Sequence, residues 1–264
     1  MNLPFRLLLI TDRSLMGTDP VGRVIELARA KVPGWALQWR DPRATPADLY
    51  RDLLAIRERL ASTSDGADAD QPTTQAQANA GGESASGQSA HAESRLHEAS
   101  ARVAAVVHES GAHVASRTHQ GLRIFVNDRV DVAAALGLDA HLKETSLPTR
   151  VARALLPPPA LLGRSVHAVS SAAIAAEEGA DHLLFGPIFD TPSKRAFGPP
   201  QGLDALRRVA AAVPIPVFAV GGIDASSAEE CIAAGAAGIA VIRAVWDHPQ
   251  PMEAIREILD TLPS

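Results

Sequence analysis

The sequence lacks the features of secreted, membrane-embedded and nucleic-acid-binding proteins. Its single cysteine, Cys231, excludes a disulfide framework within the chain and fits a reducing compartment. The apolar run LLLI at residues 7–10 is too short for a signal-peptide core, and no run approaches the length of a membrane span. The net charge of −5 and the pI of about 6.0 leave no basic excess. We therefore expect a soluble cytoplasmic protein whose main partner is neither nucleic acid nor a membrane.

One long segment also lacks every large apolar residue. Residues 62–95 contain no Val, Ile, Leu, Met, Phe, Trp or Tyr. Such a segment cannot bury enough apolar surface to offset the entropy that is lost when it becomes ordered. The composition predicts a disordered insert near the second helix of a single domain that spans residues 1–264. The insert is either a dispensable loop expansion or a regulatory or partner-binding element.

The rest of the chain alternates short β-like runs with helical stretches. Thr45 before Pro46 is typical of a helix N-cap, and Ser226 with Glu229 has the spacing of a capping box. The helix-like segments include residues 19–31, 45–61, 96–110, 170–179 and 226–235. The β-like runs are residues 6–11, 35–39, 122–126, 139–142, 161–166, 182–186, 216–220 and 238–242.

Strands that alternate with helices imply parallel pairing, because each crossover must travel back along the sheet. We expect an α/β protein built as a closed (β/α)8 TIM barrel, with an open doubly wound sheet as the alternative. No G-x-G-x-x-G motif follows the first strand, which counts against a dinucleotide-binding fold. In a barrel, functional residues collect at the C-terminal ends of the strands.

Polar residues follow nearly every predicted strand. Each has a structural alternative: Asn127 or Asp128 could cap the third helix, Arg40 could pair with a surface acid, and Asp12 could end a turn. Their placement on one predicted face favours a functional site. The strand-end residues are Thr11, Asp12, Gln38, Arg40, Asp41, Asn127, Asp128, His141, Ser165, His167, Thr191, Ser193, Lys194, Gly221, Gly222 and Arg243.

The run AVGGID, which contains Gly221 and Gly222, predicts a phosphate site. These glycines follow a strand and precede a helix, so the backbone can approach a ligand closely and present its N–H groups. Arg243, just past the last strand, would add a bidentate contact. A plain tight turn is the alternative. The preceding loop, between the sixth and seventh predicted strands, contains Thr191, Ser193 and Lys194. Their hydroxyl and ammonium groups suit phosphate or carboxylate oxygens; the alternative is an exposed polar loop.

His167 stands at the end of the fifth predicted strand, over the barrel mouth. An unperturbed imidazole titrates near ~6.5, so it can take and return a proton at neutral pH. The sequence shows no metal-ligand spacing, and Ser165 lies too close in the chain to suggest a triad. A lone histidine is more often structural, but the neighbouring anion site favours proton transfer as its role.

Eight runs carry a resemblance to a known family. They are ITDR, LQWRD, FVNDRVDVAAALGLDAHL, LLGRSVH, GADHLLFGPIFDTPSK, PQGLDAL, IPVFAVGGI and AAGIAVIRAV. In order and spacing these runs resemble the thiamine phosphate synthases and their sister group, the TenI-type thiazole tautomerases. The resemblance covers nearly the whole chain except residues 62 to about 120. It implies a barrel of thiamine synthesis that binds a phosphorylated thiazole.

The chain departs from the synthase pattern, in which two aspartates hold magnesium for the departure of pyrophosphate. Asp128 matches one of them, so it is a metal ligand only if the chain is a synthase, but Ser146 stands at the position of the other. Lys143 and Glu144 replace a glycine and a glutamine, and Glu144 could reach the metal only if its loop moved. Pro42 stands where the synthases have a lysine. Because a hydroxyl is a poor substitute for a carboxylate as a magnesium ligand, these departures weigh against a synthase.

The tautomerase pattern is matched by His167 in GRSVH and by Asp41, which stands where the pattern has a glutamate. The resemblance implies that His167 carries the proton that converts a carboxythiazole phosphate into its aromatic isomer, while Asp41 orients the substrate or assists. Gly221, Gly222 and Arg243 would hold the phosphate. Further substrate contacts are expected from Gln38, Arg40, Asn127, Ser165, Thr191, Ser193 and Lys194.

The leading hypothesis is therefore a thiazole tautomerase, an isomerase that needs no cofactor. A thiamine phosphate synthase, which would need magnesium to join an aminopyrimidine pyrophosphate to thiazole phosphate, is the first alternative. A non-catalytic relative that binds phosphorylated thiazole or thiamine, and a different phosphosugar enzyme, stay open because a fold alone does not determine function. The sequence also leaves open whether the chain forms homo-oligomers.

Overall fold

The computed structural model describes residues 3–62, 118–119, 121–156, 158–191, 195 and 198–263. These residues belong to one compact unit, which is built from the chain before residue 65 and after residue 115. Apart from Ser62, the predicted insert lies outside the described residues, as does the helix predicted over 96–110. No helix of the described part of the chain is long and apolar enough to cross a membrane.

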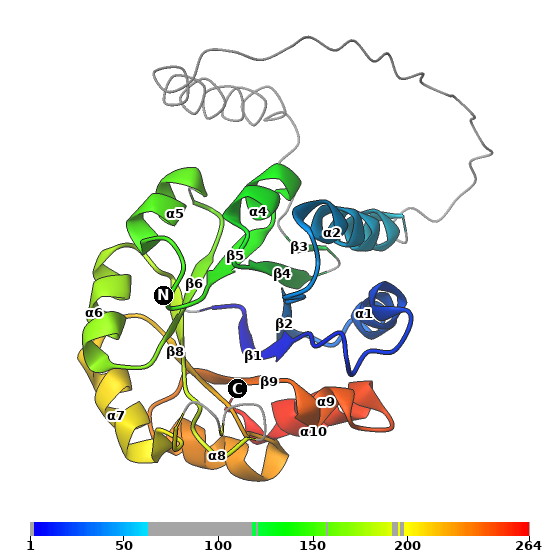
Figure 1. The fold of residues 1–264 in the computed structure, drawn as a ribbon. Coiled ribbons are helices and arrows are strands. Elements are labelled where there is room, and N and C mark those ends of the chain that lie inside the picture. The colour runs from blue at the N-terminus through cyan, green and yellow to red at the C-terminus, as the bar shows by residue number, and fades with distance from the viewer. Residues whose placement is uncertain are drawn as a thin grey trace, which may run out of the picture. The chain divides into compact units, whose positions relative to one another are not determined.

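The strands close into a barrel that is surrounded by helices (Figure 1). The parallel strands are β1 (Phe5–Ile10), β2 (Gly34–Trp39), β4 (Leu122–Asn127), β5 (Asp139–Leu142), β6 (Leu162–Val166), β7 (His182–Phe185), β8 (Val217–Val220) and β9 (Gly238–Val241). Each pairs in parallel with its neighbours, and the pairings of β1 with β9 and of β2 with β4 complete the ring. A two-residue strand, β3 (Thr118–His119), adds an antiparallel pairing to β4. The predicted (β/α)8 barrel is confirmed, and the open sheet is excluded.

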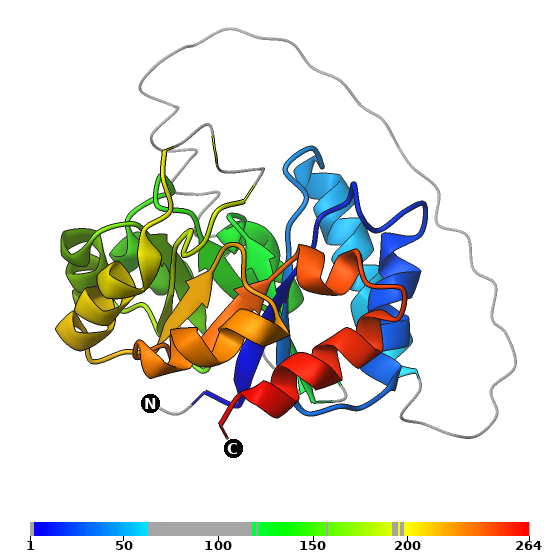
Figure 2. The same cartoon turned by 90° about the horizontal axis from the view of Figure 1, so that it is seen from below.

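Helices follow the strands and pack around the ring. They are α1 (Pro20–Arg29), α2 (Pro46–Ala61), α4 (Val130–Leu136), α5 (Thr149–Leu155), α6 (Val169–Glu177), α7 (Gly202–Ala212), α8 (Ala225–Ala233), α9 (Arg243–Trp246) and α10 (Pro251–Thr261). Helix α10 lies along the barrel against α8 and α9 (Figure 2). The Trp246 indole donates a hydrogen bond to the carbonyl of Ile10 at 2.8 Å. This bond holds α9, and with it Arg243, beside the C-terminal end of β1.

Two helix starts test the predicted caps. The Thr45 hydroxyl accepts a hydrogen bond from the Asp48 N–H, and the Asp48 carboxylate accepts one from the Thr45 N–H, each at 3.2 Å. This confirms the cap predicted for α2. The cap predicted at Ser226 is wrong, because Asp224 caps α8 by accepting hydrogen bonds from the N–H groups of Ser226 at 3.0 Å and Ser227 at 3.2 Å. Ser226 already lies in the first helical turn, whereas the extended backbone of Asp224 lets its carboxylate reach both donors.

The hydrophobic core has one part outside the ring of strands and one part inside it. Leu7 and Leu9 of β1 pack outward against the helices, whereas Leu8 and Ile10 point inward, as the two-residue period of a strand requires. The inner cluster consists of Phe5, Leu8, Ile10, Ala36, Phe125, Leu184, Phe218 and Ala240. Because this cluster fills the barrel, a substrate can be bound only by the residues above it, at the C-terminal ends of the strands.

Two histidines are buried inside the barrel, with ring centroids 5.7 Å apart. Burial lowers the pKa of His182 to about 3 and that of His141 well below its ordinary value of 6.5, so both rings are neutral at pH 7. Gly163 makes room for them, because a Cβ there would lie 2.3 Å from His141 Nδ1 and 2.5 Å from the His182 ring. The aromatic neighbours of His182 are Phe5, Phe125 and Phe218.

Candidate active site

Charged residues from β1, β2 and β9 meet at the C-terminal end of the barrel. The Thr11 hydroxyl accepts a hydrogen bond from the Arg40 N–H at 2.7 Å and donates one to the Arg40 carbonyl at 2.9 Å, which fixes the chain where it leaves β2. The pKa of Asp12 is lowered chiefly by the hydrogen bond from Ser14, with smaller contributions from the positive charges of Arg40 and Arg243. Arg40 and Arg243 therefore face the same carboxylate, as their strand-end positions predict.

His167 lies one residue beyond β6, and its ring is held by a hydrogen bond at one nitrogen. Its Nδ1 lies 2.6 Å from the carbonyl oxygen of Gly186, which can only accept a hydrogen bond. Nδ1 therefore carries the proton, and Nε2 is the basic nitrogen of the neutral ring. Nε2 lies 3.8 Å from a carboxylate oxygen of Glu144, and 43% of the His167 side chain is exposed. The ring is thus oriented, accessible and able to accept a proton at Nε2.

Glu144 is a residue of this site that the sequence analysis did not place there. Its second carboxylate oxygen accepts a hydrogen bond from the backbone N–H of His167 at 3.1 Å. The Arg164 guanidinium holds the loop by donating to the carbonyls of Glu144 at 2.8 Å and Leu147 at 2.7 Å. The order of the strands does offer a signal that Glu144 and His167 are close. They follow β5 and β6, which are adjacent, and residues that directly follow two adjacent strands of a barrel lie close together.

Asp128 occupies a backbone conformation that only a few non-glycine residues adopt, with φ at +62°. Its carboxylate forms an ion pair with the Lys143 ammonium and accepts a hydrogen bond from the Ser146 hydroxyl. The Ser146 oxygen in turn accepts a hydrogen bond from the Lys143 N–H at 2.9 Å.

These residues do not fit the magnesium ion of a synthase. Magnesium prefers several hard oxygen ligands in octahedral geometry, but an ammonium ion pairs with the one carboxylate present and a hydroxyl replaces the other. In the described ranges, His, Cys, Asp and Glu form no group of three or more that could hold a metal ion. The cation beside Asp128 is therefore part of the protein itself.

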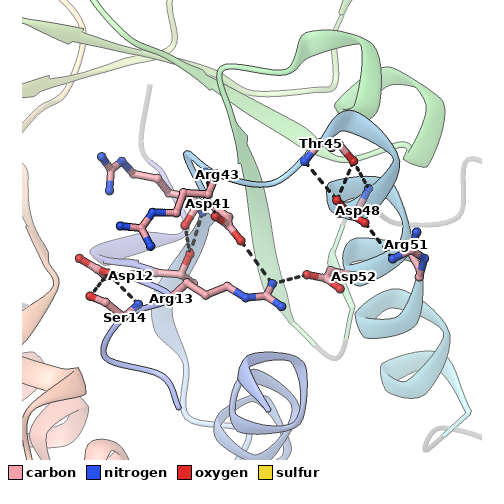
Figure 3. A network of polar contacts seen from close by, with 11 residues as sticks. Asp12, Arg13, Ser14, Asp41, Arg43, Thr45, Asp48, Arg51 and Asp52 are labelled. Carbon is pink, nitrogen blue, oxygen red and sulfur yellow. Dashed lines mark hydrogen bonds and ion pairs between the residues drawn. The ribbon is translucent and has the colours of Figure 1, made fainter. Parts of the chain in front are cut away.

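Asp41 belongs to a separate network beside α2 (Figure 3). Arg13 lies between two carboxylates, with Nη1 3.3 Å from Asp41 and 2.7 Å from Asp52. The hydrogen bond to Asp52 is the main reason why the pKa of Arg13 is raised. Asp41 also accepts a hydrogen bond from the Arg43 N–H at 3.1 Å. Since β4 and β5 separate β2 from β6 in the ring, the structure does not bring Asp41 to His167, and its catalytic role stays a prediction.

Three of the expected substrate contacts line the floor of the barrel mouth. Gln38 is 2% exposed, and its Nε2 has no hydrogen-bond partner among the described residues. The Ser165 hydroxyl lies 2.9 Å from Nε2 of the buried His141. Asn127 ends β4 and pairs in register with His141 of β5. The amides of Gln38 on β2 and Asn127 on β4 and the hydroxyl of Ser165 on β6 therefore lie near the C-terminal ends of their strands, where they could contact a polar ligand.

The glycine turn after β8 has a structural role in addition to the predicted one. Gly221 and Gly222 have φ of +101° and +69°, which glycine adopts without strain. A Cβ on Gly221 would lie 2.7 Å from Pro187, and one on Gly222 would lie 2.8 Å from Cβ of Phe189. The turn also accepts a hydrogen bond at the Gly221 carbonyl from the Phe189 N–H at 3.0 Å. The glycines are therefore required for the loop after β7 to pack, whether or not a phosphate binds.

The other residues expected to bind a phosphate are Arg243 and those of the loop after β7. The Arg243 guanidinium donates to Asp247 at 3.1 Å and is 58% exposed in its side chain. On its outer side is a groove of about 480 Å³ that is also lined by the acids Asp224, Asp247 and Glu257. These carboxylates disfavour an anion there, so a phosphate would have to approach Arg243 from the barrel mouth. Thr191 follows Asp190 in the loop after β7, while Ser193 and Lys194 lie outside the described residues.

A model of the thiamine monophosphate synthase family matches residues 94–245. The matched stretch contains the strands from β4 to β9 and therefore Asp128, Glu144, His167 and the glycine turn. Strands β1 and β2 precede it, so Gln38, Arg40 and Asp41 lie outside the match.

The curated relatives match about half of the chain. A putative thiamine-phosphate synthase of Geobacter sulfurreducens is 47% identical over 144 residues, which make up 54% of this chain and 68% of that protein. A thiamine-phosphate synthase of Methanoculleus marisnigri is 45% identical over 146 residues, or 55% of this chain and 69% of that one.

Solved structures resemble the whole barrel. A thiamine phosphate pyrophosphorylase from Pyrococcus furiosus aligns with a TM-score of 0.66 and 25% identity, over 97% of this chain and 95% of that chain. A thiamine phosphate pyrophosphorylase from Bacteroides thetaiotaomicron aligns with a TM-score of 0.54 over 97% of both chains, but at 13% identity it supports the fold alone.

Proposed function

The chain belongs to the thiamine monophosphate synthase family, and we propose that within this family it is a thiazole tautomerase-like isomerase that acts on a carboxythiazole phosphate by proton transfer. One observation carries the proposal: the Lys143 ammonium and the Ser146 hydroxyl occupy the Asp128 carboxylate that a synthase would use for magnesium. A proton shift within one ring releases no pyrophosphate, so it needs no metal ion to stabilise a leaving group.

In this proposal His167 moves the proton. With Nδ1–H bound to the Gly186 carbonyl, the Nε2 lone pair takes a proton from the thiazole ring. The imidazolium that forms lies beside the Glu144 carboxylate and returns the proton to another atom of the ring. No atom is gained or lost, and the product is the aromatic isomer. The substrate would be held by Gln38, Arg40, Asn127, Ser165, Thr191, Ser193, Lys194, Gly221, Gly222 and Arg243, and Asp41 would orient it only after release from Arg13.

The names of the relatives favour a second candidate, a thiamine phosphate synthase. The proteins from Geobacter sulfurreducens and Methanoculleus marisnigri both carry that name, the former as putative. For this activity Asp128 would have to exchange the Lys143 ammonium for a metal ion with no second aspartate beside it.

Two assays of the full-length protein decide between the candidates. The first follows the isomerisation of carboxythiazole phosphate in the presence of EDTA, and the second follows thiamine phosphate formation from thiazole phosphate and an aminopyrimidine pyrophosphate with magnesium. We expect turnover in the first. His167→Asn should lower it by about 100-fold or more, the usual scale for a general acid–base residue, while substrate binding stays nearly unchanged. His248→Asn, which alters a histidine between α9 and α10, should have no effect.

The outcomes separate the hypotheses. Robust magnesium-dependent formation of thiamine phosphate without isomerisation refutes the proposal in favour of the synthase. Tight binding of phosphorylated thiazole without turnover in either assay refutes both enzymes and indicates a regulatory binding protein.

A further inference from the structure

We infer that Glu144 is the positioning residue for His167 and supplies the carboxylate that the resemblance assigns to Asp41. The inference rests on the proposed function, in which His167 carries a positive charge while it holds the proton. A negative charge beside Nε2 is useful only in that state, so it stabilises the step rather than the resting site.

Glu144 contacts His167 at two points. One carboxylate oxygen accepts the backbone N–H of His167 at 3.1 Å, and the other lies 3.8 Å from Nε2. The first contact fixes where His167 lies, and the second places a negative charge at the nitrogen that gains the proton. The Gly186 carbonyl binds Nδ1–H, and the Glu144 carboxylate lies beside Nε2. Each of the two ring nitrogens of the imidazolium therefore has an oxygen near it.

The loop that carries Glu144 is held in place before any substrate binds. Arg164 donates to the carbonyls of Glu144 and Leu147, and Lys143 is paired with Asp128. Burial lowers the pKa of Arg164, but a guanidinium with an ordinary value of 12.5 keeps its charge at neutral pH. The carboxylate is thus positioned by contacts on both sides of it, which reduces the reorganisation needed during the reaction.

Asp41 is already engaged elsewhere. Its carboxylate is only 8% exposed and is shared with Arg13, which also binds Asp52. To assist His167 it would have to leave a cation and cross the sector of the ring that β4 and β5 occupy. Glu144 needs neither movement.

Three substitutions of Glu144 separate a positioning role from a purely structural one. Glu144→Gln keeps an oxygen for the His167 N–H but removes the negative charge. Glu144→Asp keeps the charge on a shorter side chain, and Glu144→Ala removes both. We expect kcat for isomerisation to fall about 10-fold in Glu144→Gln, the scale for a charge 3.8 Å from a cation in a half-exposed site, with KM unchanged. Glu144→Asp should recover part of this loss, and Glu144→Ala should lose at least as much as Glu144→Gln.

The matched control is Glu26→Gln, because Glu26 is an exposed carboxylate on α1, which follows β1 on the opposite side of the ring from β6 and His167. It should keep the wild-type kcat. A double variant, Glu144→Gln with His167→Asn, should be no slower than His167→Asn alone, because Glu144 acts only through the histidine.

A readout without turnover keeps this inference distinct from the proposed function. The ¹⁵N resonances of the His167 ring should shift in Glu144→Gln and stay in place in Glu26→Gln. A wild-type kcat in Glu144→Gln, or an unchanged His167 spectrum, overturns the role of Glu144. A shifted spectrum in a protein that does not isomerise the thiazole leaves the contact standing and overturns the proposed function instead.

Discussion

The buried histidine pair makes the stability of the barrel depend on pH in a range where few other groups titrate. In the unfolded chain a histidine binds a proton below its ordinary pKa of 6.5, but native His182 does not do so until the pH approaches 3. Between these values the unfolded state binds more protons than the native state, so the free energy of unfolding falls as the pH falls. The stability is complete above pH 6.5 and is lost progressively below it.

The size of this effect follows from the shift. One proton taken up only by the unfolded state lowers the free energy of unfolding by about 1.4 kcal/mol per pH unit. From pH 6.5 to pH 5 His182 alone should account for about 2 kcal/mol, and His141, whose pKa is shifted in the same direction, adds to it. The charged groups that face the pair are Arg123 and Arg164, and both oppose protonation.

Urea unfolding of the full-length protein at pH 7.5, 6.5, 5.75 and 5 measures the effect. His182→Leu has a similar volume, cannot titrate and removes two ring nitrogens that have no partner among the described residues. It should flatten the pH dependence by about one proton without loss of stability at pH 7.5. His248→Gln should leave the slope unchanged. If wild-type and His182→Leu proteins lose equal stability between pH 6.5 and 5, the argument from the buried ring is refuted.

Three further predictions test other parts of the molecule. Gly163→Ala should lower the free energy of unfolding, measured in urea, by about 2 kcal/mol or more, because its Cβ would overlap both buried histidine rings. Gly137→Ala is the comparison: its Cβ would meet no atom, so any loss of stability there comes from the positive φ alone. Arg243→Ala should weaken binding of phosphorylated thiazole in calorimetry by about 1–3 kcal/mol, and equal affinity for the unphosphorylated ring would move the anion site elsewhere. The double variant Lys143→Gly with Ser146→Asp should bind magnesium in calorimetry, since it frees Asp128 and restores the second carboxylate. If magnesium produces no heat of binding with this variant, the assignment of these positions as the lost metal site is refuted.

The fold was predictable because its signals are local and repeated. Each predicted strand is a short apolar run between a helix end and a polar residue, and the observed strands begin and end within one residue of the predicted ones. The two-residue strand β3 carried no such signal, because its pairing with β4 depends on residues brought together only by the fold. The helices after the last strand, α9 and α10, were not among the predicted segments, and the packing of Trp246 on β1 that marks where α9 lies depends on the fold.

The candidate site was predictable only to the level of its position. Topology alone places every strand end at one mouth, so the approximate location of His167 and Arg243 follows from the alternation of strands and helices. Which acid meets which base depends on side-chain direction, and there the prediction is incomplete: Arg13 holds Asp41, and Glu144 approaches His167. The sequence alone does not show which of Asp41 and Glu144 approaches His167, because that depends on how the neighbouring strands are arranged.

The glycine turn shows the same limit for binding residues. A glycine pair after a strand fits a phosphate site, but here the loop after β7 also needs both glycines for packing. A Gly222→Val protein that bound phosphate weakly would therefore say nothing about where the phosphate lies, because its Cβ would first displace the backbone near Asp190 at 2.9 Å. Arg243, which no backbone contact requires, is the informative position.

One loop carries most of the departures that separate the two candidate activities. Residues 143–146 follow β5, and each departure from the synthase pattern there has a partner after an adjacent strand: Lys143 and Ser146 meet Asp128 after β4, while Glu144 meets His167 after β6. The changes depend on one another, because Glu144 without Lys143 would place a second negative charge near an unpaired Asp128, in a site that no longer has the ligands for a metal ion. With Lys143 present, Asp128 is neutralised and the charge of Glu144 acts on the histidine alone. On the proposed function, replacing metal chemistry by proton transfer therefore depends on changes in this loop, together with Pro42 after β2, while the barrel that supports them stays the same.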